Sequence, residues 1–525
     1  MVGVAGKSKG CNTCRARKIA CDQQRPDCGQ CTRSNRVCGG YRRERVFVLV
    51  QPSAAAKKKH TFLRSSPSSE SESNAELSDH VVETSKSSST GQLVTRDWSN
   101  GADYSFAERG TAYAMMQTQN ERHNLVLAFL SNCLPTQWTS SPRSWISLLA
   151  ELPTGVKALE IAGAAVAASA IGNRFQDAAL KRHSLNLYTQ GLQQLQSALW
   201  NRNLARDDGT LAACMALSLY EAMECPDAGS EGYFSHCRGL LALVEARGIQ
   251  AHSSGAGHQL FLGVRIPGIL YALERQVPSF MFESSWMEQP WEVIPKTFFS
   301  QVVDCLAKAP RILQRVYLLQ HLSPEDQIQL CHELIRECWQ IDEKIDTIWN
   351  GMHNATPDPL YWLVPSRVSS ASFDSESSDN LFPIVFCFAN PECATTLILL
   401  WAVRVMLWSG LCNLYNGIVA FESLVLQVIE SPFDSTSTAG AVKPPLPALG
   451  HRRDYISMAH NVCQSVEYLL QDELLLAGPL SVCPALGIVI DTLRDQPPYA
   501  NEVIWLQKAL GVVRQRGIGL LKYSR

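Results

Sequence analysis

The sequence predicts a small cysteine-rich domain of two short helices built around metal ions, then a serine-rich linker and a large all-α domain. Three observations carry this prediction. Six of the 18 cysteines fall between positions 11 and 38. Serine dominates residues 65–90, and from about position 106 apolar residues recur at helical spacing. We expect domain boundaries at 1–45, 46–104 and 105–525.

Length and charge distinguish a small basic head from a large acidic body. The chain has 525 residues and 46% hydrophobic content, which is ample for a sizeable core. Residues 1–60 contain fourteen Lys and Arg against three acidic residues, a net charge of +11. Because the whole chain carries −2, the other 465 residues carry −13. This asymmetry is typical of a phosphate-binding module attached to a part that does not touch phosphate.

Neither the N-terminal residues nor the longest apolar run indicates a secreted or membrane protein. Residues 1–10 contain two lysines and no apolar block, so no secretory signal is expected and the thiols should lie in a reducing compartment. The best apolar run, Ala394 to Val403, stops at Arg404 and has about half the length that a bilayer needs. We therefore expect a soluble chain with no membrane partner.

The six N-terminal cysteines form an internal repeat. A group spaced by two and then six intervening residues recurs 17 positions later. Two-residue spacing lets both sulfurs of a pair meet one zinc ion at about 2.3 Å. Six thiolates satisfy two four-coordinate ions only if two sulfurs bridge both ions. The expected ligands are Cys11, Cys14, Cys21, Cys28, Cys31 and Cys38.

Short helices should carry these ligands. Asn12 or Thr13 can cap a helix from Cys14 to Ile19, and Asp27 can cap one from Cys28 to Asn35. Helices of one or two turns are marginal alone. Structural zinc supplies roughly 10–16 kcal/mol of apparent binding energy, so the region should be unfolded without metal.

The cysteine spacing resembles that of the fungal Zn2Cys6 zinc-cluster transcription factors, with Arg15, Arg17, Lys18 and Ile19 inside the first unit and Pro26 in the connecting loop. The resemblance implies two zinc ions per chain. It also implies that the first and fourth cysteines bridge the ions, and that the first helix enters the major groove of double-stranded DNA to read a CGG triplet.

The basic residues divide into base readers and phosphate contacts. Lys18 fits a base reader because lysine pairs with the O6 and N7 acceptors of guanine. The resemblance matches Lys18 to the lysine that reads the triplet, and Arg17 to its basic neighbour. Phosphate contacts, which position the module without specifying sequence, are expected from Arg15, Thr32, Arg33, Arg36, Arg42 and Arg43.

Other interpretations of the head stay open at this point. A metal store is disfavoured by the basic residues between the ligands, whereas a zinc module that contacts protein or RNA is the main alternative. Lys57 to Lys59 fit a nuclear import signal and ordinary linker charge equally well.

No heptad pattern for a coiled coil follows the cluster, because Pro52 interrupts the apolar run at 46–50 and residues 53–90 are mostly polar. Residues 1–60 should therefore bind one triplet as a monomer, and any dimer should form through the body.

Several helices can be placed in the body. Gly248 should end a helix, and Ser323 should cap one that begins at Pro324. Polar loops are expected at 366–379 and 431–450. The expected buried stripes are Leu185, Tyr188, Leu192, Leu195 and Leu199 in one helix, and Cys331, Ile335, Cys338, Ile345 and Trp349 in another. The stripe from Leu185 to Leu199 also has heptad spacing, but we expect it to pack in the core of the body and not to form a coiled coil.

This body resembles the fungal-specific transcription factor domain that often accompanies the zinc cluster, which implies a regulatory role. The residues that carry the resemblance are Leu185, Asp208, Gly209, Thr210, Leu211, Ser218, Leu219, Tyr220, Glu221, His236, Gly239, Leu240, Leu243, Arg247 and Gly248.

No catalytic constellation accompanies these features. Gly6 to Ser8 lacks the earlier glycine of a phosphate-binding loop, and Cys331 and His332 point about 100° apart on a helix. The sequence therefore predicts a nuclear, non-enzymatic regulator of RNA polymerase II transcription. Its expected partners are DNA and the transcription machinery or co-regulators, and its expected targets a metabolic or secondary-metabolite gene set. The alternative is a nuclear interaction protein whose zinc module contacts protein or RNA.

Overall fold

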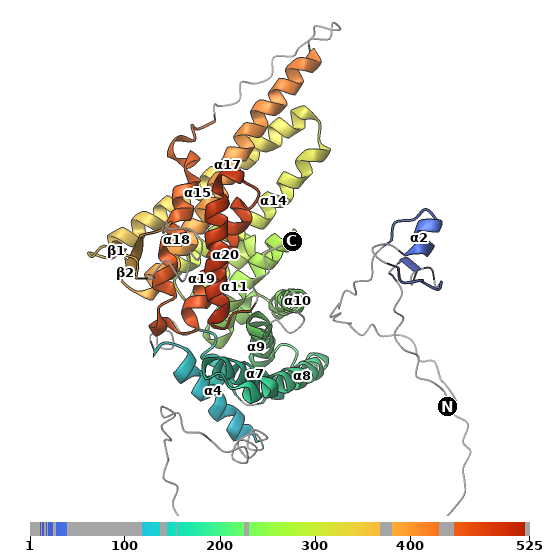
Figure 1. Cartoon of the computed structure of the whole chain (residues 1–525), viewed down its shortest axis with the longest axis vertical. Helices are drawn as coiled ribbons and strands as arrows, with labels where there is room; N and C mark the ends of the chain where they lie inside the picture. Colours follow the sequence, from blue (N-terminus) through green and yellow to red (C-terminus); the bar gives the residue numbers. More distant parts are fainter. Residues whose placement is uncertain are drawn as a thin grey trace, which may run out of the picture. The chain divides into compact units, whose positions relative to one another are not determined.

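The structure is a computed structural model of a chain with a cysteine-rich head and a helical body (Figure 1). It describes residues 11, 13–14, 17, 19–24, 28–38, 118–136, 144–153, 155–224, 230–367, 381–429 and 446–519. The linker predicted at 46–104 lies outside the described residues.

The head contains α2 (Gly29–Arg33). The helices of the body are α4 (Gln119–Cys133), α6 (Leu148–Glu151), α7 (Lys157–Arg174), α8 (Ala178–Trp200), α9 (Asp208–Glu224), α10 (Glu231–Arg247), α11 (Gly255–Arg275), α12 (Ser284–Glu288), α13 (Phe298–Ala307), α14 (Ala309–Leu318), α15 (Pro324–Ala355), α17 (Pro391–Ile429), α18 (Tyr455–Leu469), α19 (Ala477–Leu493) and α20 (Ala500–Gln515). The short 3-10 helices are η2 (Ile249–His252), η3 (Phe280–Phe282), η4 (Gln289–Trp291), η5 (Leu319–His321), η6 (Gly450–Arg453), η7 (Asp472–Leu474) and η8 (Pro497–Tyr499). The strands are β1 (Tyr361–Pro365) and β2 (Ile384–Phe388).

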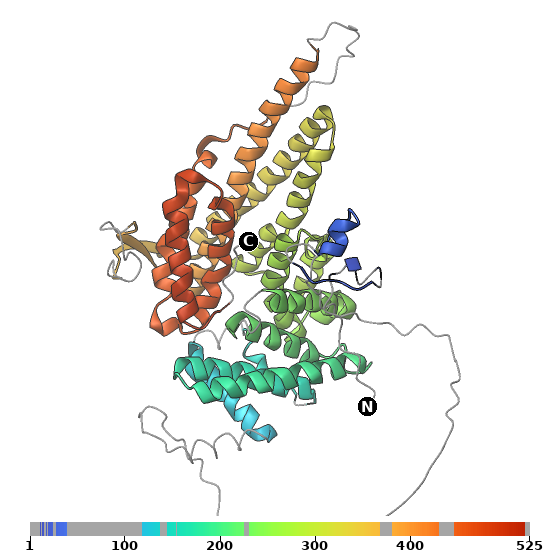
Figure 2. The ribbon, with the colours of Figure 1, turned by 45° about the vertical axis from the view of Figure 1, so that its right-hand side comes forward.

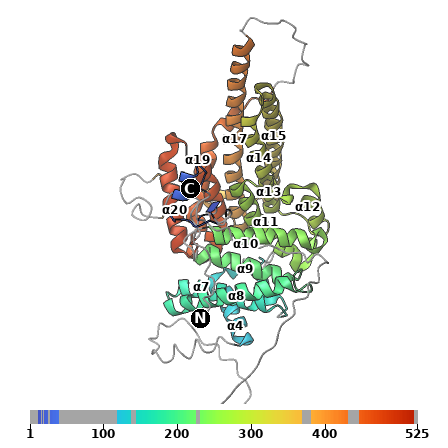
Figure 3. The ribbon, with the colours of Figure 1, turned by 90° about the vertical axis from the view of Figure 1, so that its right-hand side faces the viewer.

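The first helices of the body stack in successive layers (Figure 3). α7 packs against α4, α8 and α9, and α10 then links α9 to α11. The alanine-rich sequence of α7 allows these close packings because small side chains let neighbouring backbones approach. At the crossing with α8, a Cβ on Gly191 would lie 3.6 Å from the Cα of Ala162 and 3.0 Å from the side chain of Leu217. The layers are therefore held at a spacing that larger side chains would not permit.

α17 is the central helix of the remaining layers, and it contacts α13, α15, α18 and α19. Its far end projects beyond the C-terminal helices (Figure 2). The apolar run at 394–403 is only part of this helix, which continues through Arg404 to Ile429. Arg404 is 8% exposed and its guanidinium pairs with Asp342 and Asp346 of α15. An apolar helix can therefore carry a buried charge without ending there.

Among the described residues, one helix has the length and composition that could cross a membrane. It is the Pro391–Glu422 part of α17, and 78% of its most apolar window is buried in the body. The apolar run at 394–403 is therefore part of a helix that has the length and composition to span a bilayer, which the length of the run alone did not indicate. The burial of this window is what the core helix of a helical domain would show.

The predicted all-α body also contains a small antiparallel sheet. β1 pairs with β2 in the register Tyr361↔Phe388 to Pro365↔Ile384. The inner face packs on α17 and α18, where the Phe386 ring lies 5.6 Å from that of Trp401 and the Phe388 ring 5.1 Å from that of Tyr468. The polar loop predicted at 366–379 connects these strands, and its residues 368–379 lie outside the described residues.

Two predicted helix ends are confirmed. The Ser323 hydroxyl accepts a hydrogen bond from the Asp326 N–H at 3.3 Å, and Pro324 is the first residue of α15. Gly248 follows α10 with φ +81°, a conformation that favours glycine, and its N–H donates to the carbonyls of Val244 and Glu245. The buried stripe of α15 is also confirmed except at its end, because Trp349 is only half-buried.

The stripe predicted for α8 is partly wrong. Leu185 is 47% exposed, whereas Tyr188 and Leu195 are buried as expected. Leu192 and Leu199 are half-buried. The buried face of α8 is rotated from the predicted one and consists of Leu180, Ser184, Leu187, Tyr188, Gly191, Leu195 and Ala198.

Candidate metal centre

Two short turns, related by the sequence repeat, hold the cysteines of the head. In the first, the N–H of Arg17 donates to the carbonyl of Thr13 and the N–H of Ile19 to that of Cys14, both at 3.1 Å. The second is α2, five residues long. It is shorter than the helix predicted at 28–35, so local backbone bonding contributes little to its stability.

Cysteine sulfurs take the capping role that the sequence assigned to other residues. The Cys14 N–H donates to Sγ of Cys11, and the Cys31 N–H donates to Sγ of Cys28, both at 3.3 Å. The predicted cap Thr13 instead donates its hydroxyl hydrogen to the carbonyl of Val37 at 3.1 Å. Cys28 is the N-cap of α2, so the prediction for Asp27 was wrong; Asp27 and Asn12 lie outside the described residues. An anionic sulfur at such a position would be stabilised by the N–H groups of the turn.

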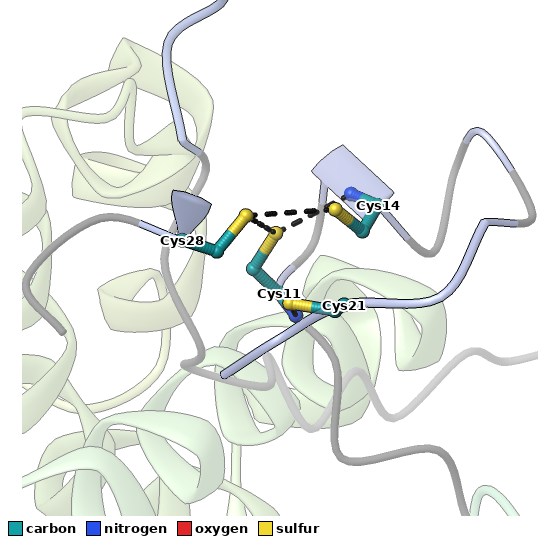
Figure 4. A group of neighbouring side chains, drawn as sticks. All are labelled: Cys11, Cys14, Cys21 and Cys28. Atoms are coloured by element: carbon teal, nitrogen blue, oxygen red, sulfur yellow. Dashed lines mark hydrogen bonds between the residues drawn. The ribbon is translucent and has the colours of Figure 1, made fainter. Parts of the chain in front are cut away.

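The six sulfurs fall into two overlapping groups of four. Cys11, Cys14, Cys21 and Cys28 form one group (Figure 4), and Cys11, Cys28, Cys31 and Cys38 form the other. Within each group all sulfurs lie within 4.8 Å of one another. Cys11 and Cys28 belong to both groups, so the structure brings together all six cysteines that the sequence selected.

The sulfur spacing fits tetrahedral zinc. A tetrahedron with Zn–S bonds of about 2.3 Å has edges of about 3.8 Å. The Sγ atoms of Cys11 and Cys28 are 3.5 Å apart, as are those of Cys14 and Cys28, and those of Cys11 and Cys31 are 3.8 Å apart. Desolvation raises the pKa of the Cys14, Cys28 and Cys31 thiols. Two divalent cations would favour the thiolate forms, because thiolates are the metal-binding state.

The comparisons with known proteins agree with this geometry. Residues 9–45 match the model of the fungal Zn(2)-Cys(6) binuclear cluster domain. These residues belong to that family. The domain therefore binds two zinc ions, and the donor set described above accounts for both.

Curated relatives match over about forty residues or over a longer part of the chain. Arginine metabolism regulation protein II of Saccharomyces cerevisiae is 50% identical over 40 residues, which are 8% of this chain and 4% of that protein. The aspercryptin biosynthesis cluster-specific transcription regulator atnN of Emericella nidulans is 49% identical over 39 residues, 7% of this chain and 6% of that protein. An uncharacterised protein of Emericella nidulans is 24% identical over 228 residues, 41% of this chain and 48% of that protein.

In each of these relatives the match spans less than half of the relative's own length. The longest match is several times longer than the zinc-cluster domain, so the similarity to that protein extends into other parts of the chain. No solved structure shows significant similarity to the chain.

Outside the sulfurs, Asp22 ties the two halves of the zinc-cluster domain together. Its carboxylate accepts from the Gly29 N–H at 3.0 Å and pairs with Arg33 at 3.5 Å. A Cβ on Gly29 would lie 2.4 Å from a carboxylate oxygen of Asp22, so glycine leaves room for this contact. Asp22 was not among the predicted site residues, because Gly29 and Arg33, which it joins, lie seven and eleven positions away.

The structure describes four of the eight residues predicted to contact DNA. The side chains of Arg17, Arg33 and Arg36 are exposed, and Arg17 donates to the Ser34 hydroxyl at 3.2 Å. The Thr32 hydroxyl donates to the Cys28 carbonyl at 3.2 Å, so it supports the turn. The other four, Arg15, Lys18, Arg42 and Arg43, lie outside the described residues.

Proposed function

We propose that this chain is a nuclear, sequence-specific DNA-binding transcription regulator of RNA polymerase II genes, which reads a CGG-type triplet through its zinc cluster. The observation that carries the proposal is the pair of four-sulfur groups sharing Cys11 and Cys28, within a segment that matches the binuclear cluster family. The named regulators among the relatives support the same role. The proposal includes no catalytic residue.

Within the cluster, Cys11 and Cys28 would bridge the two ions, since they alone belong to both sulfur groups. Cys14 and Cys21 would complete the first ion, and Cys31 and Cys38 the second. The metal supplies the tertiary constraint that a core would otherwise supply. It thereby fixes the first turn, and the basic residues on it, against α2.

For DNA contact, Lys18 and Arg17 would read base edges, and Arg15, Thr32, Arg33, Arg36, Arg42 and Arg43 would hold phosphates. The exposure of Arg17, Arg33 and Arg36 supports this division because charged donors at a DNA interface must be accessible before binding. The Arg17–Ser34 bond orients one guanidinium across the two turns.

A mobility-shift experiment on the full chain tests the proposal. We expect tighter binding to a CGG-bearing duplex than to an unrelated duplex of the same length. Lys18→Ala should cost about 1–3 kcal/mol on the preferred site and reduce its preference. Arg42→Ala should weaken binding to both duplexes alike and make the logarithmic salt slope shallower by about one unit. Equal binding of the wild type to both duplexes would instead favour an interaction protein that contacts protein or RNA.

The proposed layout is a DNA-binding domain at 1–45, a linker at 46–104 and a regulatory domain at 105–525, which acts on co-regulators or the transcription machinery. A metabolic or secondary-metabolite gene set is the proposed target, by analogy with relatives named for arginine metabolism and aspercryptin biosynthesis. Residues 1–60 would bind one triplet as a monomer. Sedimentation of that fragment with one-triplet and two-triplet duplexes would contradict this if a cooperative 2:1 complex of fixed spacing formed.

A further inference from the structure

The helical body contains a cavity of about 440 Å³ between α11, α13, α19 and the N-terminus of α17. This volume is within the range of small-molecule sites. Leu262, Ile266, Phe299, Val303 and Leu480 supply its apolar wall. Four of these five side chains are only half-buried although they lie between packed helices, because they face the cavity. The cavity therefore offers apolar surface to a ligand.

Arg265 gives this cavity a charged wall. It is 2% exposed, and its guanidinium donates to the Ser300 carbonyl at 3.2 Å and to the carboxylate of Asp304. Lys296 also binds Asp304, with 2.5 Å between Nζ and the carboxylate. Two cations thus share one fully buried carboxylate, which leaves a local excess of positive charge. Burial lowers the pKa of Arg265 despite the carboxylate, as expected for a cation that is incompletely compensated.

The N-terminus of α17 adds to this positive potential. Asn390 caps the helix by accepting from the Cys393 N–H at 2.8 Å, and Asn390, Pro391 and Thr395 line the cavity. The N-terminal end of a helix dipole favours anions. Glu392 also lines the cavity and opposes this effect, but it is exposed, so solvent screens its charge.

A second cavity of about 220 Å³ adjoins the first, since Ile266 and Leu480 line both. It is bounded mainly by apolar and aromatic side chains. Each of its long walls contains an internal proline, Pro267 in α11 and Pro484 in α19. A proline inside a helix removes one backbone donor and bends the helix, which explains a space between otherwise well-packed elements. The pair of cavities is polar and cationic at one end and apolar at the other.

We propose that these adjoining cavities bind a small amphipathic acid, with its carboxylate at Arg265 and its apolar part between α11 and α19. The role of this ligand would be that of an effector of DNA binding. That role rests on the function proposed above, whereas the binding of the ligand does not.

Calorimetry on the full chain, without DNA, tests the inference with decanoate as the probe and decanol as its uncharged counterpart, both below micelle-forming concentrations. We expect one decanoate per chain and an affinity about tenfold or more above that of decanol, because the charge-assisted bond is made only by the acid. Leu262→Trp should fill the cavity and abolish binding. Ile504→Trp, on the exposed surface of α20, is the matched control and should bind as the wild type does.

Two charge variants make the test independent of cavity filling. Arg265→Met should remove most of the preference for the acid over the alcohol. Glu392→Gln should tighten decanoate binding by up to roughly fivefold, since a screened opposing charge is removed. No saturable decanoate binding, equal binding of decanol, or binding retained by Leu262→Trp would each overturn the inference. Any of these results would leave the mobility-shift result unaffected, so the two proposals fail separately.

Discussion

The zinc-cluster domain and the helical body are stabilised by different means. Among the described residues of the cluster, the buried ones are Cys11, Cys14, Cys28 and Cys31, and the apolar Ile19 and Val37 are 40% and 91% exposed. In the body, the largest fully buried side chains are instead Trp401, Tyr220, Phe129 and Phe261. A segment this small cannot bury enough apolar surface to fold. Its stability must come from metal–sulfur bonds, whereas that of the body comes from packing.

This difference predicts that each part can unfold while the other stays folded. A perturbation of the sulfurs should leave the thermal transition of the body in place. A cavity in the body should leave the metal content unchanged.

The largest effect should follow loss of a shared sulfur. Cys28→Ser removes a ligand from both proposed ions and should abolish folding of the cluster, which depends on roughly 10–16 kcal/mol of metal-binding energy. Metal analysis should give two zinc ions per wild-type chain, and DNA binding should be lost in the variant while the melting of the body is unchanged. Cys387→Ser, at a half-buried cysteine of β2, is the control and should keep both ions. One zinc per wild-type chain would contradict the bridging arrangement.

The converse perturbation is a cavity in the body. Trp401 is 1% exposed and packs against Tyr361, Phe386 and Phe388. Trp401→Ala should reduce the free energy of unfolding of the body by about 3–5 kcal/mol, with two zinc ions still bound. Trp200 is 78% exposed, so Trp200→Ala should change stability little. Loss of zinc in Trp401→Ala would show that the two parts fold as one unit.

Low pH should also reduce the stability of the body, because the imidazole of His236 is buried. Burial lowers the pKa of His236 to about 4 from its ordinary value of 6.5. Between these values the unfolded chain binds a proton that the folded chain excludes, so stability falls as pH decreases from 6.5 to 4 and is unaffected above this window. The loss should be up to about 3 kcal/mol. Denaturant unfolding at several pH values should show a shallower decline in His236→Gln than in the wild type.

The exposed His353 of α15 supplies the control for that series. His353→Gln should reproduce the wild-type pH dependence. A decline of equal slope in His236→Gln would mean that other groups cause the acid sensitivity.

The two parts also differ in how much of them the sequence predicts. The cysteine ligands could be found because metal ligands on short turns must lie at fixed local spacing. The caps could not, because the sulfurs of Cys11 and Cys28 compete for the N–H groups that Thr13 and Asp27 were expected to bind. The burial of Arg404 was also not predicted, because its partner Asp346 lies 58 positions away in the sequence. The β1–β2 sheet was missed because each strand has only five residues, too few for alternation to distinguish it from a helix.

The smallest effect concerns the face of α8 and separates a core helix from a zipper. Leucines at alternating spacings of three and four predicted a buried stripe that includes Leu185 and Leu195. In the structure Leu187 and Leu195 are buried and Leu185 is not, so the buried face of α8 is rotated from the predicted one. Leu185→Ser should therefore change stability by no more than about 0.5 kcal/mol, as for other exposed positions. Leu195→Ser, at 6% exposure, should cost at least about 2 kcal/mol. Both variants should keep two zinc ions and the sedimentation coefficient of the wild type. If Leu185→Ser instead dissociated a solution dimer, the exposed leucine would be a contact between two copies of the body, and dimerisation would belong to α8.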